Sequence, residues 1–129
     1  MSNVPTDRRY TASHEWVQPK GDGLFRVGIT DHAQALLGDL VFVETPGLDK
    51  SIQAGQDCAV VESVKAASDV YAPIAGSISA SNEALASTPE GINQDPYGAG
   101  WIFEIKAANP ADYDALLDAA AYQALIAEG

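Results

Sequence analysis

The sequence lacks most of the features that mark secreted, membrane-spanning or disulfide-linked proteins. Cys58 is the only cysteine, so no intramolecular disulfide can form and a reducing compartment fits. No apolar run approaches the roughly 20 residues that cross a bilayer. The first seven residues contain neither the apolar core of a signal peptide nor the Arg- and Ser-rich pattern of a transit peptide. These absences predict a cytoplasmic location, or a mitochondrial matrix location if the chain is a processed form.

Basic residues are also scarce, with 7 against 18 acidic residues and a net charge of −11. Such a surface repels phosphate groups, so we expect neither nucleic acid nor an anionic membrane as a partner. It favours partners with basic docking surfaces, although an acidic composition can also serve solubility alone.

Apolar residues make up 47% of the 129 residues, which is enough for a packed core. A chain of this length suits one domain, and we expect residues 1–129 to form it. The first residues are mostly polar. We therefore predict that residues 1–9 are a flexible N-terminal segment.

Alternating apolar residues predict several short β-strands. Phe25, Val27 and Ile29 alternate with other residues, and the turn sequence KGDG joins this run to the preceding HEWVQP, which predicts a β-hairpin. Further strands are predicted at residues 40–44, in both arms of 55–76, at 76–81 and at 101–106. Short strands about 8–12 residues apart are typical of a small barrel or sandwich.

Two helices are predicted from their capping residues. Thr30 or Asp31 can cap a short helix that Gly38 ends. Asn109 caps a second helix, which begins at Pro110 and is expected to run to about residue 126. Its expected apolar face consists of Tyr113, Leu116, Leu117, Ala120 and Ala124. A single helical turn capped by Asn82 is also expected, and residues 88–99 are expected to be loop.

Lys65 stands apart from the other three lysines. Lys20 and Lys50 lie in predicted turns and Lys106 ends a predicted strand, whereas Lys65 lies near the middle of residues 55–76. If the two arms of this segment pair as a hairpin, Lys65 lies at or near its tip and its amine is open to a modifying enzyme. Spacing alone favours an ordinary exposed lysine, since lysines are mostly exposed in any protein.

The segment around Lys65, VESVKAASDVYAP, resembles the lipoylation segment of glycine cleavage H proteins. Other segments resemble the same family in the same order: HEWV, VGITDHAQALLGDLVFVE, NEALAS, NQDPYGAGW and DALLDAAAYQAL. This collinear resemblance extends from about Tyr10 to Leu125. It implies a mainly β, lipoyl-domain-like barrel-sandwich hybrid with a short internal helix and a C-terminal helix.

The resemblance implies a carrier protein, not an enzyme, with lipoate joined to the Lys65 amine as an amide. In this family the arm takes the aminomethyl group of glycine from a PLP-dependent glycine decarboxylase and presents it to a folate-dependent aminomethyltransferase. Dihydrolipoyl dehydrogenase then reoxidises the arm, and lipoate-attaching enzymes load it. No residue of the chain is expected to be catalytic, because a carrier contributes effective concentration and not an acid, base or nucleophile.

Three acidic residues are candidates for supporting roles. Glu62 and Asp69 flank Lys65 and could fix its register for the lipoate-attaching enzyme, or could simply be solvent-facing strand residues. Glu15 could bind the amino group of the arm in a cleft that shields a water-sensitive adduct. Alternatively, Trp16 fills the core and the polar pair of His14 and Glu15 lies at its rim.

The other candidate groups indicate no further chemistry. The two histidines and the single cysteine have no metal-site spacing, so no metal is expected. Cys58 lies in an apolar strand and is predicted to be a buried, inert thiol. Asp95, Tyr97 and Gly98 also resemble family residues and are interpreted as turn residues.

Related carriers fit less well. Lipoyl domains of 2-oxoacid dehydrogenases have aspartate before the lysine, where Val64 stands here. Biotin carriers have methionine on both sides, but Met1 is the only methionine of this chain. Two alternatives stay open: a lipoyl donor or relay protein for other lipoylated complexes, and an unmodified interaction module.

Overall fold

The computed structural model describes residues 4–128, which form two antiparallel sheets and several short helices. The strands are β1 (Arg9–Tyr10), β2 (Glu15–Gly21), β3 (Leu24–Ile29), β4 (Leu40–Glu44), β5 (Ser51–Ile52), β6 (Asp57–Ser63), β7 (Ala67–Tyr71), β8 (Gly76–Ser81) and β9 (Phe103–Ala107). The helical segments are α1 (Asp31–Leu37), η1 (Glu83–Ala86), α2 (Gly91–Gln94), η2 (Pro110–Ala115) and α3 (Ala119–Glu128), where η marks a 3₁₀ helix. Within the described residues, no helix is both long enough and apolar enough to span a membrane.

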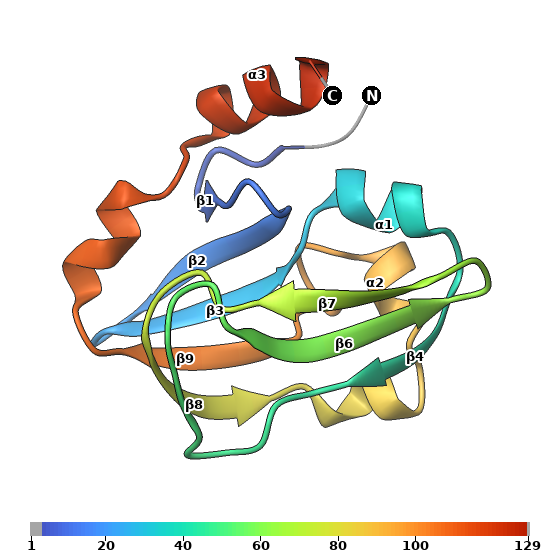
Figure 1. The fold of residues 1–129 in the computed structure, drawn as a ribbon, viewed down its shortest axis with the longest axis horizontal. Helices are drawn as coiled ribbons and strands as arrows, with labels where there is room; N and C mark the ends of the chain where they lie inside the picture. The colour runs from blue at the N-terminus through green and yellow to red at the C-terminus, as the bar shows by residue number, and fades with distance from the viewer. Residues whose placement is uncertain (1–3, 129) are drawn as a thin grey trace.

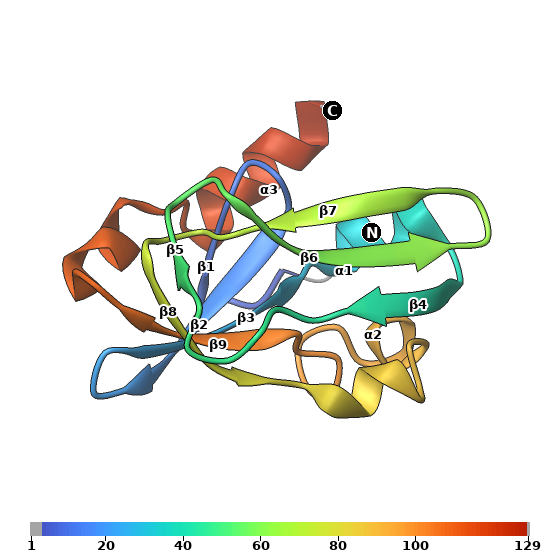
Figure 2. The ribbon, with the colours of Figure 1, turned by 60° about the horizontal axis from the view of Figure 1, so that its bottom comes forward.

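The two sheets form the sandwich that the sequence predicts. The larger sheet has the order β1-β2-β3-β9-β8-β5, and the smaller has the order β4-β6-β7. The predicted β2–β3 hairpin is confirmed, with Val17 opposite Val27. The β6–β7 hairpin is confirmed too, and its turn lies at one extremity of the molecule (Figures 1 and 2). The prediction of a mainly β architecture with an internal helix and a C-terminal helix is therefore confirmed.

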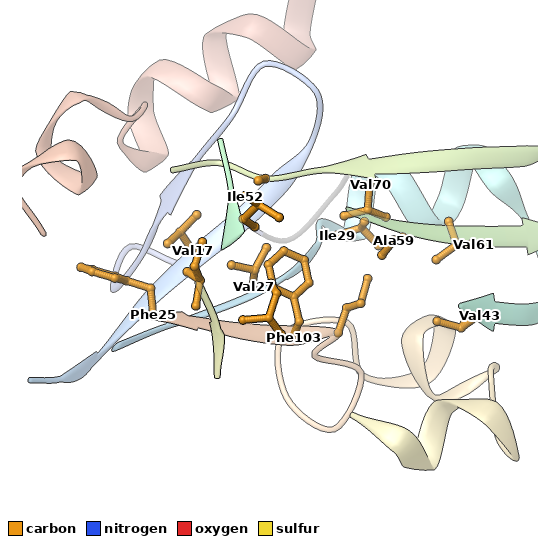
Figure 3. Packing of buried hydrophobic residues seen from close by; sticks show 14 of the residues in the cluster. Val17, Phe25, Val27, Ile29, Val43, Ile52, Ala59, Val61, Val70 and Phe103 are labelled. Atoms are coloured by element: carbon orange, nitrogen blue, oxygen red, sulfur yellow. The ribbon is translucent and has the colours of Figure 1, made fainter. Parts of the chain in front are cut away.

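The main hydrophobic core lies between the two sheets (Figure 3). Val27 of β3 and Phe103 of β9 pack in the same cluster as Val61 of β6 and Val70 of β7, and all four are at most 1% exposed. Burying a side chain of this size stabilises the fold by roughly 1.5–3 kcal/mol. The core therefore holds the base of the β6–β7 hairpin firmly against the larger sheet.

A second, aromatic cluster joins α3 to β1 and β2. The rings of Tyr10 and Tyr122 stack with centroids 4.8 Å apart. The buried Trp16 indole donates a hydrogen bond to the Pro96 carbonyl oxygen at 2.9 Å. Gly28 is required on the neighbouring strand, because a Cβ there would lie 2.7 Å from three atoms of the Trp16 ring. This packing fixes the strand that begins at Glu15.

The internal helix α1 follows its predicted caps. Thr30 is the N-cap, and its hydroxyl oxygen accepts a hydrogen bond from the Ala33 amide at 3.2 Å. Gly38 ends the helix with φ +85°, a conformation that favours glycine. The helix therefore stops beside the turn of the β6–β7 hairpin (Figure 2).

The prediction of one continuous C-terminal helix over residues 110–126 is wrong, because two separate helical segments form there. Asn109 caps a helix beginning at Pro110, as predicted, but this 3₁₀ helix ends at Ala115 and the chain becomes extended at Leu116. Leu117 then pairs with Tyr10 of β1, exchanging backbone hydrogen bonds of 2.7 and 2.9 Å. This long-range pairing overrides local helix propensity and divides the predicted apolar face.

Two smaller predictions also need correction. Residues 88–99 are not all loop, because α2 forms within them. Asn82 does not cap η1, since its amide donates instead to the carbonyl oxygens of Ala99 and Trp101. The flexible segment predicted over residues 1–9 lies partly outside the described residues, and for the rest it stays a prediction. Val4 and Arg8 are each 8% exposed, which is packing that argues against it.

Candidate functional site

Lys65 lies in the turn between β6 and β7, and its side chain is exposed, as predicted. Ser63 shapes this turn from within: its hydroxyl oxygen accepts hydrogen bonds from the amides of Lys65 and Ala66, both at 3.1 Å. The Ser63 amide in turn donates to the Ala66 carbonyl oxygen at 2.8 Å. The turn thus has a defined backbone conformation while the lysine side chain remains accessible.

The turn is also fixed to the body of the molecule. The Val64 amide donates a 3.1 Å hydrogen bond to the Asp39 carbonyl oxygen, which lies between α1 and β4. The stem of Lys65 lies against Gly38, where a Cβ would be only 3.1 Å from the lysine Cε. Within residues 4–128 the Lys65 amine forms no ion pair. Its amine is therefore available for acylation without breaking a salt bridge.

A partly open cavity of about 140 Å3 lies along the same hairpin, between it and α1. Its walls are mainly apolar, with Leu36 and Leu37 from α1 and Val61 and Val70 from the hairpin. Its polar lining comes from Ser13, His14, Glu15, Ser68 and Asp69. Ser68 is three residues after Lys65, about 10 Å along an extended strand, so a flexible group on Lys65 can reach the cavity.

Glu15 contributes a buried carboxylate to this cavity. It is 1% exposed, so the alternative that placed it at the rim of the core is wrong. One carboxylate oxygen accepts hydrogen bonds from the hydroxyls of Thr11 and Ser13, each at 2.6 Å. The other accepts a longer bond, 3.4 Å, from the Tyr71 amide. Burial raises the pKa of Glu15 above its ordinary value, and these hydrogen bonds offset part of that rise.

His14, the neighbour of Glu15, belongs to a second polar group at the same cavity. Its ring lies 5.0 Å from the ring of His32, measured between centroids, so the fold brings the two histidines together. The His14 Nδ1 atom is 2.8 Å from the Tyr122 hydroxyl, which is also 2.7 Å from the Thr30 hydroxyl. Burial lowers the pKa of His14, and the nearby charge of His32 lowers it further by a smaller amount, so the neutral ring is favoured.

Glu62 and Asp69 both lie exposed on the outward face of the hairpin. In the β6–β7 register Glu62 pairs with Ala67 and Val60 pairs with Asp69, so the two carboxylates are diagonal neighbours. Diagonal neighbours in a sheet are close enough for one partner surface to contact both. Asp69 also lines the cavity, and Glu62 is not among the lining residues.

The remaining candidates are structural. Cys58 is half-buried and its thiol donates to the Val70 carbonyl oxygen at 3.4 Å. Burial raises the pKa of Cys58 to about 12, so the thiol stays protonated, as its predicted inertness requires. Asp95 accepts a hydrogen bond from the Ala99 amide in a turn, as predicted. Among residues 4–128 no three His, Cys, Asp or Glu side chains come together to hold a metal ion.

Sequence reasoning missed two features of this site. The hydroxyls of Thr11 and Ser13 were given no role, although their alternation with Glu15 is a visible signal once β2 is placed. Asn93 lies in the segment expected to be loop, and its side chain binds the backbone between α1 and β4. No pattern in the sequence indicates these long-range contacts.

A two-sheet sandwich with a lysine at the exposed tip of a hairpin defines a carrier domain of the lipoyl-domain class. The comparisons specify the family. Residues 8–129 match the family model described as "Glycine cleavage H-protein". The chain is 60% identical over 128 residues to the glycine cleavage system H protein of Halorhodospira halophila, covering 99% of this chain and 98% of that one. It is 57% identical over 126 residues to the H protein of Cronobacter sakazakii, covering 98% of each.

A solved structure agrees. The crystal structure of a glycine cleavage system H protein from Mycobacterium marinum superposes with a TM-score of 0.87 at 42% identity, covering 96% of this chain and 99% of that one. The chain therefore belongs to the glycine cleavage H-protein family, which confirms the family and the carrier role predicted from the resemblance.

Proposed function

We propose that this chain carries lipoate as an amide on Lys65 and serves the glycine cleavage system as a carrier without catalytic residues of its own. The observation that supports this most is the exposed Lys65 amine in a turn whose backbone is fixed at both Ser63 and Asp39. When attached, the group supplies a cyclic disulfide that can be opened to hold an aminomethyl group and later reoxidised.

The proposed partners are a PLP-dependent glycine decarboxylase, a folate-dependent aminomethyltransferase, dihydrolipoyl dehydrogenase and a lipoate-attaching enzyme. Their expected docking surfaces are basic, because the chain carries a net charge of −11. Glu62 and Asp69, diagonal neighbours on the outward face of the hairpin, present two carboxylates beside the lysine. We assign them to recognition by the lipoate-attaching enzyme. The bacterial relatives are consistent with the expected cytoplasmic location.

The cavity beside the hairpin fits the end of the lipoyl arm. A cavity of about 150 Å3 can hold a benzene-sized ring, and this one measures about 140 Å3. Its apolar walls limit contact with water, and we propose that the Glu15 carboxylate at its polar side pairs with a cationic amine that enters. Ser13 and Thr11 hold that carboxylate in place. Glu15 therefore retains a charged amine in surroundings where hydrolysis is slowed.

The test is the intact mass of the chain purified from a lipoate-supplied host, with peptide mapping. We expect a single lipoyl adduct on the peptide containing Lys65. The adduct should be absent from Lys65→Arg and present in Lys50→Arg, the matched control at another exposed lysine. An unmodified wild-type chain under these conditions, or an adduct that persists in Lys65→Arg, would contradict the proposal.

A further inference from the structure

The Asn93 side chain of α2 connects two segments that are separate in the sequence. Its amide nitrogen donates to the Gly38 carbonyl oxygen and to the Gln34 side-chain oxygen, each at 2.9 Å. Its carbonyl oxygen accepts a hydrogen bond from the Leu40 amide, also at 2.9 Å. Asn93 thus binds the last turn of α1 and the first residue of β4 with one planar group.

The bond to Leu40 leads directly to the Lys65 turn. The N–H of Leu40 and the carbonyl group of Asp39 belong to the same peptide unit, which is planar and rigid. The N–H faces Asn93, and the carbonyl oxygen faces the opposite way and accepts the bond from the Val64 amide. Orienting this peptide from one side therefore orients the acceptor that holds the turn on the other side.

β4 is an edge strand, so the Asn93 side chain stands where another strand would otherwise pair. Without it, the Leu40 N–H and the Gly38 carbonyl group lose their partners and the segment between them is free to reorient. That segment also includes Gly38, against which the stem of Lys65 lies. Both contacts of the turn with the body of the molecule thus depend on the same three residues.

Asn93 also fixes one wall of the cavity. Its two donated bonds hold the C-terminal turn of α1, which carries the lining residues Leu36 and Leu37. Through one carboxamide, the wall of the cavity and the base of the Lys65 turn keep a constant relative position.

We propose that Asn93 is a positioning residue for Lys65, which holds the Gly38–Asp39–Leu40 backbone so that the turn is presented in one conformation to the lipoate-attaching enzyme. This inference rests on the proposed function. The hydrogen bonds of the Asn93 side chain join Gln34, Gly38 and Leu40 and not the lysine amine, so its effect is on the population of the competent turn.

The test compares the wild-type apo chain with Asn93→Asp, which loses both donated bonds but keeps an acceptor for the Leu40 N–H, and with Asn93→Ala, which loses all three bonds. Loss of such bonds corresponds to about 1.4 kcal/mol, so we expect the Val64 amide to exchange its hydrogen about tenfold faster. The Ser63 amide, bonded inside the hairpin, should keep its protection. The KM of the lipoate-attaching enzyme for the chain should rise in proportion to the fall in the competent fraction of the chain, with kcat unchanged, because only that fraction binds.

Asn82→Asp is the matched control, because the Asn82 amide also donates two hydrogen bonds to backbone carbonyl oxygens, away from the hairpin. It should lower global stability while leaving KM and the ratio of Val64 to Ser63 exchange at wild-type values. Asn93→Ala adds no charge and also removes the acceptor of the Leu40 N–H, and it serves if Asn93→Asp does not fold.

Unchanged Val64 exchange and KM in a folded Asn93 variant, or equal effects in the Asn82 control, would overturn the inference. A wild-type chain that is not lipoylated at all would instead contradict the proposed function, while Val64 exchange would still report whether Asn93 holds the turn.

Discussion

The two ends of the β6–β7 hairpin are built for different tasks. At one end the turn exposes Lys65, and the adjoining Val64 is 70% exposed. Toward the other end the Tyr71 amide meets the Glu15 carboxylate, which is 1% exposed and held by two hydroxyls. A carrier needs an attachment point that other enzymes can reach and a protected place for its cargo. We propose that one hairpin supplies both, because its turn extends into solvent while the Glu15 carboxylate beside Tyr71 is buried.

The largest change in stability is expected behind Glu15. In Gly28→Ala the new Cβ would lie 2.7 Å from the buried Trp16 ring, and overpacking of this kind costs about 3 kcal/mol. Chemical denaturation measures this loss. The folded fraction should still be lipoylated, because the Lys65 turn belongs to the other sheet.

Gly47→Ala is the control for that variant, since no atom lies within 4 Å of a Cβ built at Gly47. Its unfolding free energy should stay within about 0.5 kcal/mol of wild type. Equal stability of the two alanine variants would show that the packing behind Glu15 is looser than described.

A smaller effect is expected at the exposed end. Ser63→Ala removes the hydroxyl that accepts bonds from the Lys65 and Ala66 amides, which should cost about 1 kcal/mol because both amides can turn to water. Denaturant unfolding of this variant is compared with Ser79→Ala, at an exposed position of β8. If Ser63→Ala were as stable as Ser79→Ala, the turn would not depend on the hydroxyl.

The smallest effect is a difference in pH dependence at the buried end. Because burial raises the pKa of Glu15 above its ordinary value of 4.5, the ionised form is disfavoured in the folded chain. Protonated Glu15 makes its full contribution to the free energy of unfolding below pH 4.5, and this contribution is lost as pH rises through the raised pKa. Glu15→Gln should remove this decline from a series of unfolding curves, whereas Glu62→Gln, on the exposed face, should retain it. An identical pH profile for wild type and Glu15→Gln would be evidence against a buried carboxylate with a raised pKa.

Local patterns predicted the parts of this molecule that depend on neighbours in sequence. Alternation gave β3 and the hairpin arms, Thr30 and Gly38 marked the ends of α1, and the position of Lys65 between two paired arms predicted its exposure. Predictions failed where a distant segment competes with local preference. Leu117 pairs with Tyr10 and is not helical. The Asn82 side-chain amide donates hydrogen bonds to the carbonyl oxygens of Ala99 and Trp101 and does not cap η1.

The same division applies to the site. Lys65 could be found from spacing and resemblance, but the burial of Glu15 depends on β7 and α1 folding over it, and Asn93 acts on a segment more than fifty residues before it. Such contacts follow from the topology of the two sheets, which no local window of the sequence contains.

The central claim is that glycine-dependent chemistry passes through the amine of Lys65. The most direct measurement is glycine-dependent CO2 exchange by the PLP-dependent decarboxylase in the presence of the lipoylated chain, Lys65→Arg or Lys50→Arg. We predict exchange with wild type and Lys50→Arg and none with Lys65→Arg, whose unfolding free energy should match wild type within about 0.5 kcal/mol. Exchange that persists with Lys65→Arg, or that is absent with a fully lipoylated wild-type chain, would contradict the account.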